Sequence, residues 1–424
     1  MIRIKKIKGA ALQLALLVAT VVALLLSSFL LLTHTHSLFR TQSHQLLDVI
    51  DSANTGINLF FSSEKNAGDS IVVSTDLSET VVKKEYWGAF QKIKATSKSG
   101  TKSFSKMALT AGDDIENNFA IYVTNANLPL VLAGKAKVTG NAHLPARGVK
   151  AGVISGDYFQ GKTLVNGQIS QSNPTLPELD SEWLDYVTAL QQYIPTTNDE
   201  YLNLQTENRQ SFFEPTQFHY SFDRIFTSEK YTGHIILISA TEIIVGPNSQ
   251  LKDVLVVAPK ITIQSGFKGN ATFLASVQIV VESNVHLYYP SSIIVATTNS
   301  EEEEKENFTN KDIPVLIHEN TTIEGSVFYI NEAIVDEKSK NRYRVHIKTT
   351  SNSTIHGAVY CLGNMEHLGQ VAGSIYTQKF IALADGSRYI NHLYEGQISA
   401  KNRHQDLTSI LFKNTPRTTV KWLY

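Results

Sequence analysis

The 424-residue sequence contains a single cysteine, Cys361, so it can form no intrachain disulfide and no zinc site built from several thiolates. Acidic residues (39) and basic residues (38) nearly cancel, which leaves no overall charge to attract nucleic acid. The sequence also lacks a phosphate-binding Gly-Lys-Ser/Thr loop, a dinucleotide fingerprint and a nucleophile elbow. We therefore expect no catalytic residue, no cofactor, no metal site and no nucleic-acid partner.

One long uncharged run lies near the N-terminus. It extends from Ala10 to Leu32, and as an α-helix it measures roughly 34 Å, enough to cross a hydrocarbon core of about 30 Å. Four basic residues precede the run, which predicts a cytoplasmic N-terminus and an extracytoplasmic C-terminal domain. A cleaved secretory signal is the alternative, but its apolar core is shorter and ends at a small-x-small site, which this run lacks. The run predicts a single-pass anchor in the cell membrane, in contact with the lipid bilayer.

The helical pattern continues beyond the apolar run. Between residues 33 and 61 the apolar residues recur mainly every three or four positions, at Leu38, Phe39, Leu46, Val49, Ile50, Ala53, Ile57 and Phe60. This spacing is typical of one face of an amphipathic helix. We expect a stalk helix that packs on the protein's own domain or on other copies of itself.

A short basic leader ends in Lys8-Gly9 and is followed at once by Ala10 and the long helix. In this it resembles the N-terminus of type IV pilin-like proteins, the minor pilins included. The resemblance implies cleavage between Gly9 and Ala10 by a prepilin peptidase, and packing of the helix against filament or envelope protein partners. The family usually has glutamate at the fifth mature position, where this chain has Leu14. The resemblance covers about 60 of the 424 residues.

The rest of the sequence is predicted to be mainly β. Residues 62–127 alternate strand-like runs with turn formers and indicate an antiparallel β meander. Residues 128–176 are rich in glycine, which is typical of a tightly turning β-coil segment. Residues 177–230 form a helical or irregular connection that contains one surface helix.

A short repeat indicates how the following strands are arranged. The segments that begin at Ala240, Ala258 and Ala275 align at offsets of 18 and 17 residues. A repeat of this length cannot bury its own apolar face, so we expect residues 231–298 to stack as coils of a β-helix-like solenoid. Ile263 is expected to share one core with Ile244 and Val280. A sandwich of antiparallel strands is the alternative.

A second pattern continues the repeat in residues 313–424, which we interpret as further coils and a C-terminal cap. Gly325, Gly357 and Gly373 each follow a β-branched and a variable residue, and are interpreted as corner glycines. Their spacings of 32 and 16 indicate two coils and then one. Residues 299–312 between the two blocks are an exposed acidic loop. The sequence leaves open whether the coils before Pro177 join this stack.

Polar residues that could carry chemistry have simpler explanations. We interpret the acid pairs Asp113-Asp114 and Asp180 with Glu182 as exposed or helix-capping residues. His34 and His36 are interpreted as interfacial polarity rather than as metal ligands. Two histidines flank Cys361, and one of them, His356, occupies a variable position of the repeat.

The sequence therefore predicts a structural or assembly protein of the cell envelope. Its fold class is mainly β: a transmembrane helix with an amphipathic extension, a small β meander and a β-helix-like solenoid. A membrane-anchored β-helical enzyme or binding protein that acts on envelope polysaccharide is the alternative.

Overall fold

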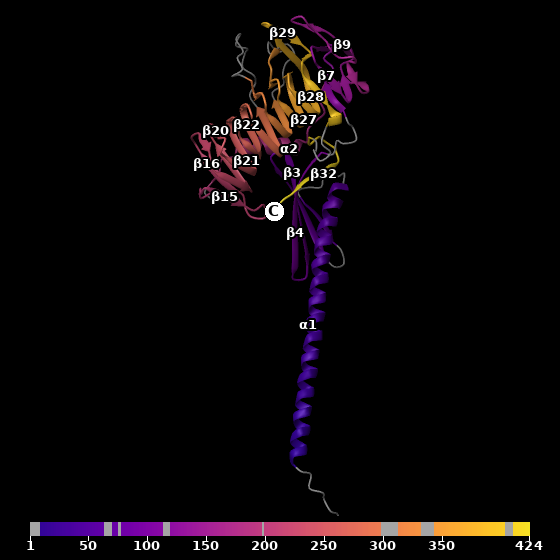
Figure 1. Ribbon diagram of the computed structural model, residues 1–424, viewed down its shortest axis with the longest axis vertical. Coiled ribbons are helices and arrows are strands. Elements are labelled where there is room, and N and C mark those ends of the chain that lie inside the picture. The colour runs from indigo at the N-terminus through magenta and orange to yellow at the C-terminus, as the bar shows by residue number, and fades with distance from the viewer. Residues whose placement is uncertain are drawn as a thin grey trace, which may run out of the picture. The chain divides into compact units, whose positions relative to one another are not determined.

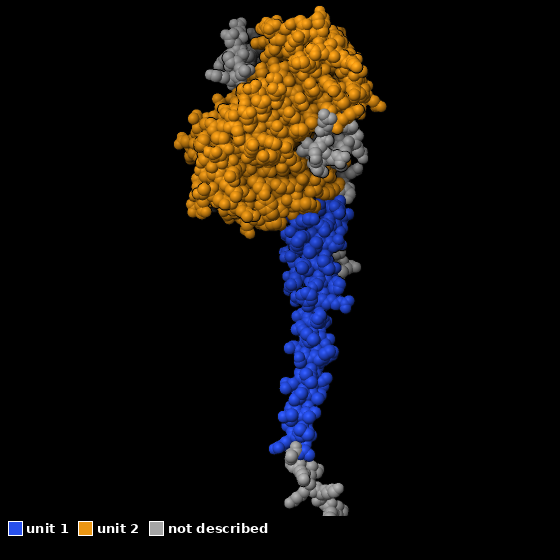
Figure 2. All heavy atoms as spheres, viewed as in Figure 1, with its two compact units in different colours: residues 1–60, 70–83, 94–106 blue, residues 61–69, 84–93, 107–424 orange. Residues whose placement is uncertain are grey.

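The computed structural model describes residues 9–62, 70–74, 78–112, 119–196, 199–297, 313–331, 343–402 and 410–424. Strand accounts for 53% and helix for 18%, so the expected mainly β class with one long N-terminal apolar helix is confirmed. Most of the basic leader, the acidic loop and the Asp113-Asp114 pair lie outside the described residues. The chain divides into two compact units (Figure 2), made of residues 1–60, 70–83 and 94–106, and of residues 61–69, 84–93 and 107–424.

The first unit is built on one continuous helix, α1 (Gly9–Ser62), which joins the expected membrane and stalk segments without a break. Strand β1 (Ser70–Ser74) pairs antiparallel with residues 79–83 of β2 (Glu79–Trp87). Near its end, α1 buries Val49, Ala53 and Ile57. Strands β3 (Phe90–Ser99) and β4 (Lys102–Gly112) contribute residues to both units.

The second unit contains a large parallel sheet. At its coarsest this sheet is a closed parallel barrel of six strands to which further strands are added. At the level of individual pairs, three parallel ladders can be followed, because long strands contribute one segment to each ladder. All of these pairings are parallel, which excludes an antiparallel sandwich for the described ladders.

Ladder A joins, in order, β15 (Glu207–Gln210), β18 (Lys230–Gly233), β21 (Gln250–Ile263), β22 (Lys268–Val281), β23 (His286–Thr297), β25 (Thr322–Asn331), β27 (Thr354–His367), β28 (Gln370–Ala384), β31 (Gln397–Ser399), β7 (Lys137–Thr139) and β12 (Val165–Asn166). Ladder B begins with β14 (Glu200–Tyr201), β16 (Gln217–Ser221) and β19 (Ile235–Ser239). It then shares β21 to β28 with ladder A and ends with β5 (Phe119–Val123), β8 (Asn141–Leu144) and β13 (Ile169–Gln171).

Ladder C runs from β17 (Ile225–Thr227) and β20 (Glu242–Val245) through β21 and β22 to β24 (Val315–Ile317), β26 (Ile347–Thr349), β27 and β28. A separate three-stranded parallel sheet contains β30 (His392–Tyr394), β6 (Leu130–Ala133) and β9 (Val149–Ala151). Two antiparallel hairpins are added, β10 (Val153–Ile154) with β11 (Asp157–Tyr158) and β28 with β29 (Ser387–Ile390). A 3-10 turn, η4, spans Ala400–Asn402.

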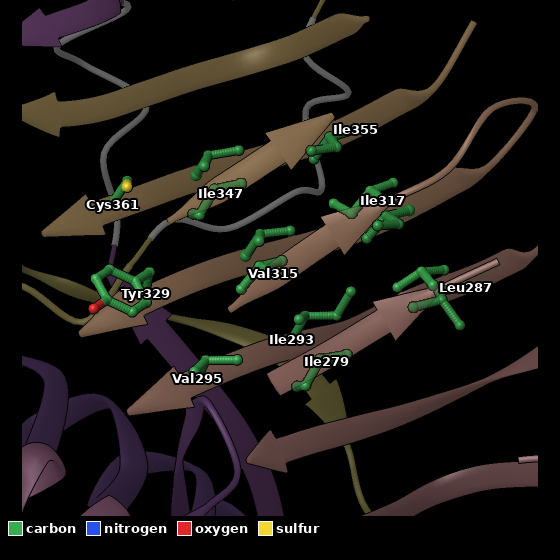
Figure 3. Close-up of a cluster of buried hydrophobic side chains, with 14 of the residues drawn as sticks. Ile279, Leu287, Ile293, Val295, Val315, Ile317, Tyr329, Ile347, Ile355 and Cys361 are labelled. Carbon is green, nitrogen blue, oxygen red and sulfur yellow. The ribbon is translucent and has the colours of Figure 1, made fainter. Parts of the chain in front are cut away.

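The main core lies between the ladders, and Figure 3 shows part of it. Ile243, Ile261 and Ile279 are consecutive partners in ladder C and are all buried. Ile263 also points into this core, but the expected partners Ile244 and Val280 do not, because they lie on the opposite face and are half-buried. A one-residue difference along a strand moves a side chain from one face to the other.

The segment that precedes Pro177 joins the far end of the same stack. In ladder B, Ile375 of β28 pairs with Ile121 of β5, and Ile121 pairs with Ala142 of β8. Ile121, Ala142 and Ile375 belong to one buried cluster with Ile243. Figure 1 shows β7 and β9 beside β28, away from β15 and β16. The two glycine-rich regions therefore share one core, and β5 belongs to it rather than to the antiparallel meander.

The connection from β13 to β14 contains α2 (Ser181–Gln191), which is the surface helix expected in residues 177–230. The remainder of that region also holds β14 to β17, so the ladders begin before residue 231. The last strand, β32 (Arg417–Trp422), pairs antiparallel with residues 108–112 of β4 instead of extending a ladder.

Candidate functional sites

The first candidate is the apolar helix. Helix α1 is long and apolar enough to span a membrane, and its apolar window is not buried against any other part of the described structure. Leu24, Leu30 and Leu32 are each at least 60% exposed. A continuous stretch of exposed leucine and valine is far larger than the apolar patches that soluble proteins tolerate. The helix therefore has an apolar surface with no partner among the described residues.

Farther along α1, one face packs within the first unit. Gly56 lies against the side chains of Thr80 and Val82, and Ser78 donates a hydrogen bond of 2.7 Å to Ser52. The stalk residues expected to pack are therefore divided. Val49, Ala53 and Ile57 are buried, whereas Leu38 (51%) and Phe39 (71%) are exposed, as is Leu47. The stalk has one apolar face covered by its own sheet and further apolar residues left uncovered.

The three corner glycines form one column. Gly325 pairs with Gly357, and Gly357 pairs with Gly373, with φ of 149°, 142° and 153°. A Cβ atom on Gly357 would overlap the carbonyl oxygen of Gly325, and the same relation holds one step along the column. Because Gly325 and Gly357 are direct partners, their spacing of 32 residues is one enlarged turn and not two coils. The glycines allow the backbones to approach, and they present no side chain to a ligand.

The outer face of ladder B carries a column of aromatic residues. Phe328, Tyr360, Tyr376 and Tyr122 are consecutive partners, and all are buried. The connection from β13 to β14 covers them. Tyr360 donates a hydrogen bond to the carbonyl oxygen of Pro177 (3.1 Å), and Tyr122 donates to that of Thr175 (3.2 Å).

Helix α2 continues this covering. The indole of Trp183 packs on Phe328 with ring centroids 5.1 Å apart, and Gln191 donates hydrogen bonds to the carbonyl oxygens of Ala275 (2.8 Å) and Ala296 (2.9 Å). Stacked aromatic residues on a β-sheet often form a sugar-binding face. Here the chain itself occupies that face, so this aromatic column is not a binding site.

A polar recess of about 360 Å³ lies at the turns between strands β26, β27, β28 and β31. It is lined by Ser351, Asn352, Gln370 and Gln397, and by Glu395, whose carboxylate accepts a hydrogen bond from the backbone N–H of Lys135 (3.1 Å). The Lys135 ammonium is 3.8 Å from the same carboxylate. Side-chain amides and hydroxyls of this kind can bind the hydroxyl groups of a small polar ligand.

The acids considered at the sequence level have structural roles. Asp180 is the N-cap of α2 and accepts a hydrogen bond from the backbone N–H of Trp183 (3.2 Å). Its other oxygen accepts from the guanidinium of Arg417 (2.8 Å), and Glu182 pairs with Lys84. Burial, together with the nearby charges of Asp180 and Glu182, raises the pKa of Tyr86 in the same cluster. These groups neutralise each other around a helix start.

Cys361 and its flanking histidines do not form a reactive site. The thiol is buried, its pKa is raised by burial, and its closest acceptor is the carbonyl oxygen of Asn364 (3.5 Å). His367 is buried and bonded to Thr349 (2.6 Å), and burial lowers its pKa to about 4. His356 points outward in the column of Glu324 and Ala372, as the repeat predicts.

His34 and His36 lie on the exposed part of α1. Among the described residues, no group of three or more histidine, cysteine or acidic side chains could hold a metal ion. Comparison with known proteins adds no relative, since no family model, curated protein or solved structure matches the chain.

Proposed function

We propose that this chain is a structural or assembly protein of the cell envelope, with α1 in the membrane and the parallel β ladders outside the cytoplasm. The observation that carries the proposal is the apolar helix whose span-length window is unburied in the described structure. Water would have to hydrate this entire surface, whereas a bilayer of about 30 Å covers it. The basic residues before Ala10 support a cytoplasmic N-terminus.

The finer description of the β domain as a solenoid belongs to the same proposal. Residues one turn apart are ladder partners, for example Glu242 with Lys260 and Lys260 with Gln278, at offsets of 18. Three ladders repeat around one core, which is how stacked coils bury apolar faces that a single repeat cannot. The column of Gly325, Gly357 and Gly373 supports the same stacking.

The assembly role rests on what α1 leaves uncovered. Ala11, Ala15, Ala19 and Ala23 recur every four residues, a spacing at which small side chains let membrane helices approach closely. Leu38 and Phe39 extend an exposed apolar surface beyond the membrane segment. We propose lateral packing of α1 with partner helices, as in the type IV filament or secretion systems that the leader resembles.

Mass spectrometry of the protein purified from membranes tests this proposal. A mature chain that begins at Ala10 is expected for a pilin-like component, and Gly9→Val is expected to block the cleavage. A chain that retains residues 1–9 removes the pilin-like part. A chain that begins beyond Leu32 removes the membrane anchor and with it the whole proposal.

The polar recess favours a second candidate function, a membrane-anchored protein that binds envelope polysaccharide. Its volume of about 360 Å³ suits one or two sugar units, and its lining offers amide and hydroxyl groups. Glycan-array binding of the purified protein tests this function, with Gln370→Ala and Gln397→Ala as the variants. Binding that is unchanged in both variants excludes the recess.

A further inference from the structure

The ladders end in unpaired strand edges. At one end lie β9, β12 and β13, and at the other end lie β14, β15 and β17. Each of these six strands pairs with one neighbour only among the described strands. Parallel solenoids commonly cover such ends with polar caps, because an open edge presents free N–H and C=O groups to another chain.

The apolar core is also incompletely covered at these two ends. The half-buried hydrophobic residues packed against the main core all belong to the terminal turns: Val149, Phe159, Leu164 and Val165 at one end, and Leu202 at the other. Ile169 (51% exposed) and Tyr201 (50%) lie on the same outermost strands. Each end therefore combines free backbone groups with uncovered apolar side chains.

The two ends carry charges of opposite sign. Residues 145–171 contain three basic residues, Arg147, Lys150 and Lys162, against one acid, Asp157. Residues 199–229 contain six acidic residues and two basic ones. Lys150 and Lys162 are exposed, and so are Glu200 and Asp223. Two like ends would repel each other, whereas unlike ends attract.

We propose that the β domains of neighbouring copies stack end to end, with residues 145–171 of one copy against residues 199–229 of the next. All strands of a ladder run in the same direction, so unlike ends can continue the parallel pairing and like ends cannot. Such a contact is heterologous and forms an open row of subunits. This inference rests on the proposed assembly function and adds a second contact to that of α1.

Short terminal strands make each contact weak, which protects the free protein from aggregation. Anchoring in a membrane raises the local concentration of the domains and so compensates for the weak contact. The row is therefore expected to form when the full chain is crowded in a bilayer and to dissociate on dilution in detergent.

The test is a charge exchange on the full chain in detergent micelles, with self-association measured by analytical ultracentrifugation. Lys150→Glu with Lys162→Glu makes both ends acidic, and Glu200→Lys with Asp223→Lys makes both ends basic. Each double variant is expected to weaken self-association about tenfold or more. An equimolar mixture of the two is expected to restore association, because unlike ends then meet again.

Lys260→Glu with Lys268→Glu is the matched control, because both residues are exposed and lie in the middle of the ladders. The unmodified protein gives a measurement that needs no folded variant: its self-association should weaken as salt rises from 50 to 500 mM. End variants that behave like the control pair, or a mixture that shows no recovery, would overturn the stacking.

Ala15→Leu with Ala19→Leu separates this inference from the proposed function, since it alters only helix packing. If this variant loses self-association while the end variants keep it, end-to-end stacking is wrong and the assembly function stands. If neither set changes self-association, both are wrong.

Discussion

Lys421 reaches the buried carboxylate of Asp253, with its ammonium nitrogen 2.6 and 2.7 Å from the two carboxylate oxygens. The Asp253 side chain is 1% exposed, and it also accepts a hydrogen bond from Tyr424 (3.1 Å). The backbone carbonyl of Asp253 accepts from the Trp87 indole (3.0 Å). This one carboxylate therefore fixes the C-terminal segment onto the ladders.

Replacing Lys421 by Met should destabilise the protein by about 3 kcal/mol, because it leaves a buried carboxylate without its cation. Chemical denaturation of the purified chain measures this loss. The control is Lys413→Met, which removes the exposed pair with Glu178 and should leave the denaturation midpoint unchanged. Equal midpoints for the two variants would show that the Asp253 pair does not hold the segment.

Gly357→Ala should cost about 3 kcal/mol, because the new methyl group would meet the carbonyl oxygen of Gly325 at a φ of 142°. Gly148→Ala is the control, since Gly148 also has positive φ (69°) but has open space around it. That variant should lose only about 1 kcal/mol. Thermal unfolding distinguishes the two, and similar losses would argue against close backbone packing in the glycine column.

The buried His367 makes stability depend on pH. Its pKa is about 4 in the folded protein, below the ordinary 6.5, so between these values the unfolded chain binds more protons. Its contribution is complete above pH 6.5 and is lost as the pH falls towards 4, by roughly 3 kcal/mol in total. Free energies of unfolding at pH 7 and pH 4.5 should differ less in His367→Gln than in the unmodified protein. Equal pH dependence would show that His367 is protonated when folded.

Trp183→Ala should destabilise the protein by about 4 kcal/mol, because the indole is 1% exposed and donates to the carbonyl oxygen of Gly88 (2.9 Å). The variant should also expose the aromatic column, which limited proteolysis within residues 172–191 would detect. Tyr158→Ala, at a side chain that is 73% exposed, is the control. Unchanged proteolysis would mean that α2 does not secure the covering segment.

The strand pattern of the sequence gave the period of the repeat correctly but not every face. The 18-residue offset between Glu242 and Lys260 is the register of the structure, yet Ile244 lies outside the core that Ile263 enters. Both faces of these strands carry aliphatic side chains, so hydrophobicity alone does not distinguish inside from outside. The second face of ladder B is apolar because α2 and its flanking residues cover it.

The spacing of the corner glycines was interpreted as two coils and then one because coils were assumed to be of equal length. The structure pairs Gly325 directly with Gly357, so their turn is longer than its neighbours. A turn can accept additional residues at a small cost in loop entropy, and spacing therefore does not count coils. Residues of the additional length, 332–342, lie outside the described structure.

The sequence by itself determined the long N-terminal helix and the mainly β character of the rest, because helix formation, apolar length and strand period depend on neighbouring residues. Only the tertiary structure decided that residues 119–171 follow β28 in the stack, and that Lys421 meets Asp253. Pairing between distant segments depends on which faces bury together, and that free energy has no signature within either segment.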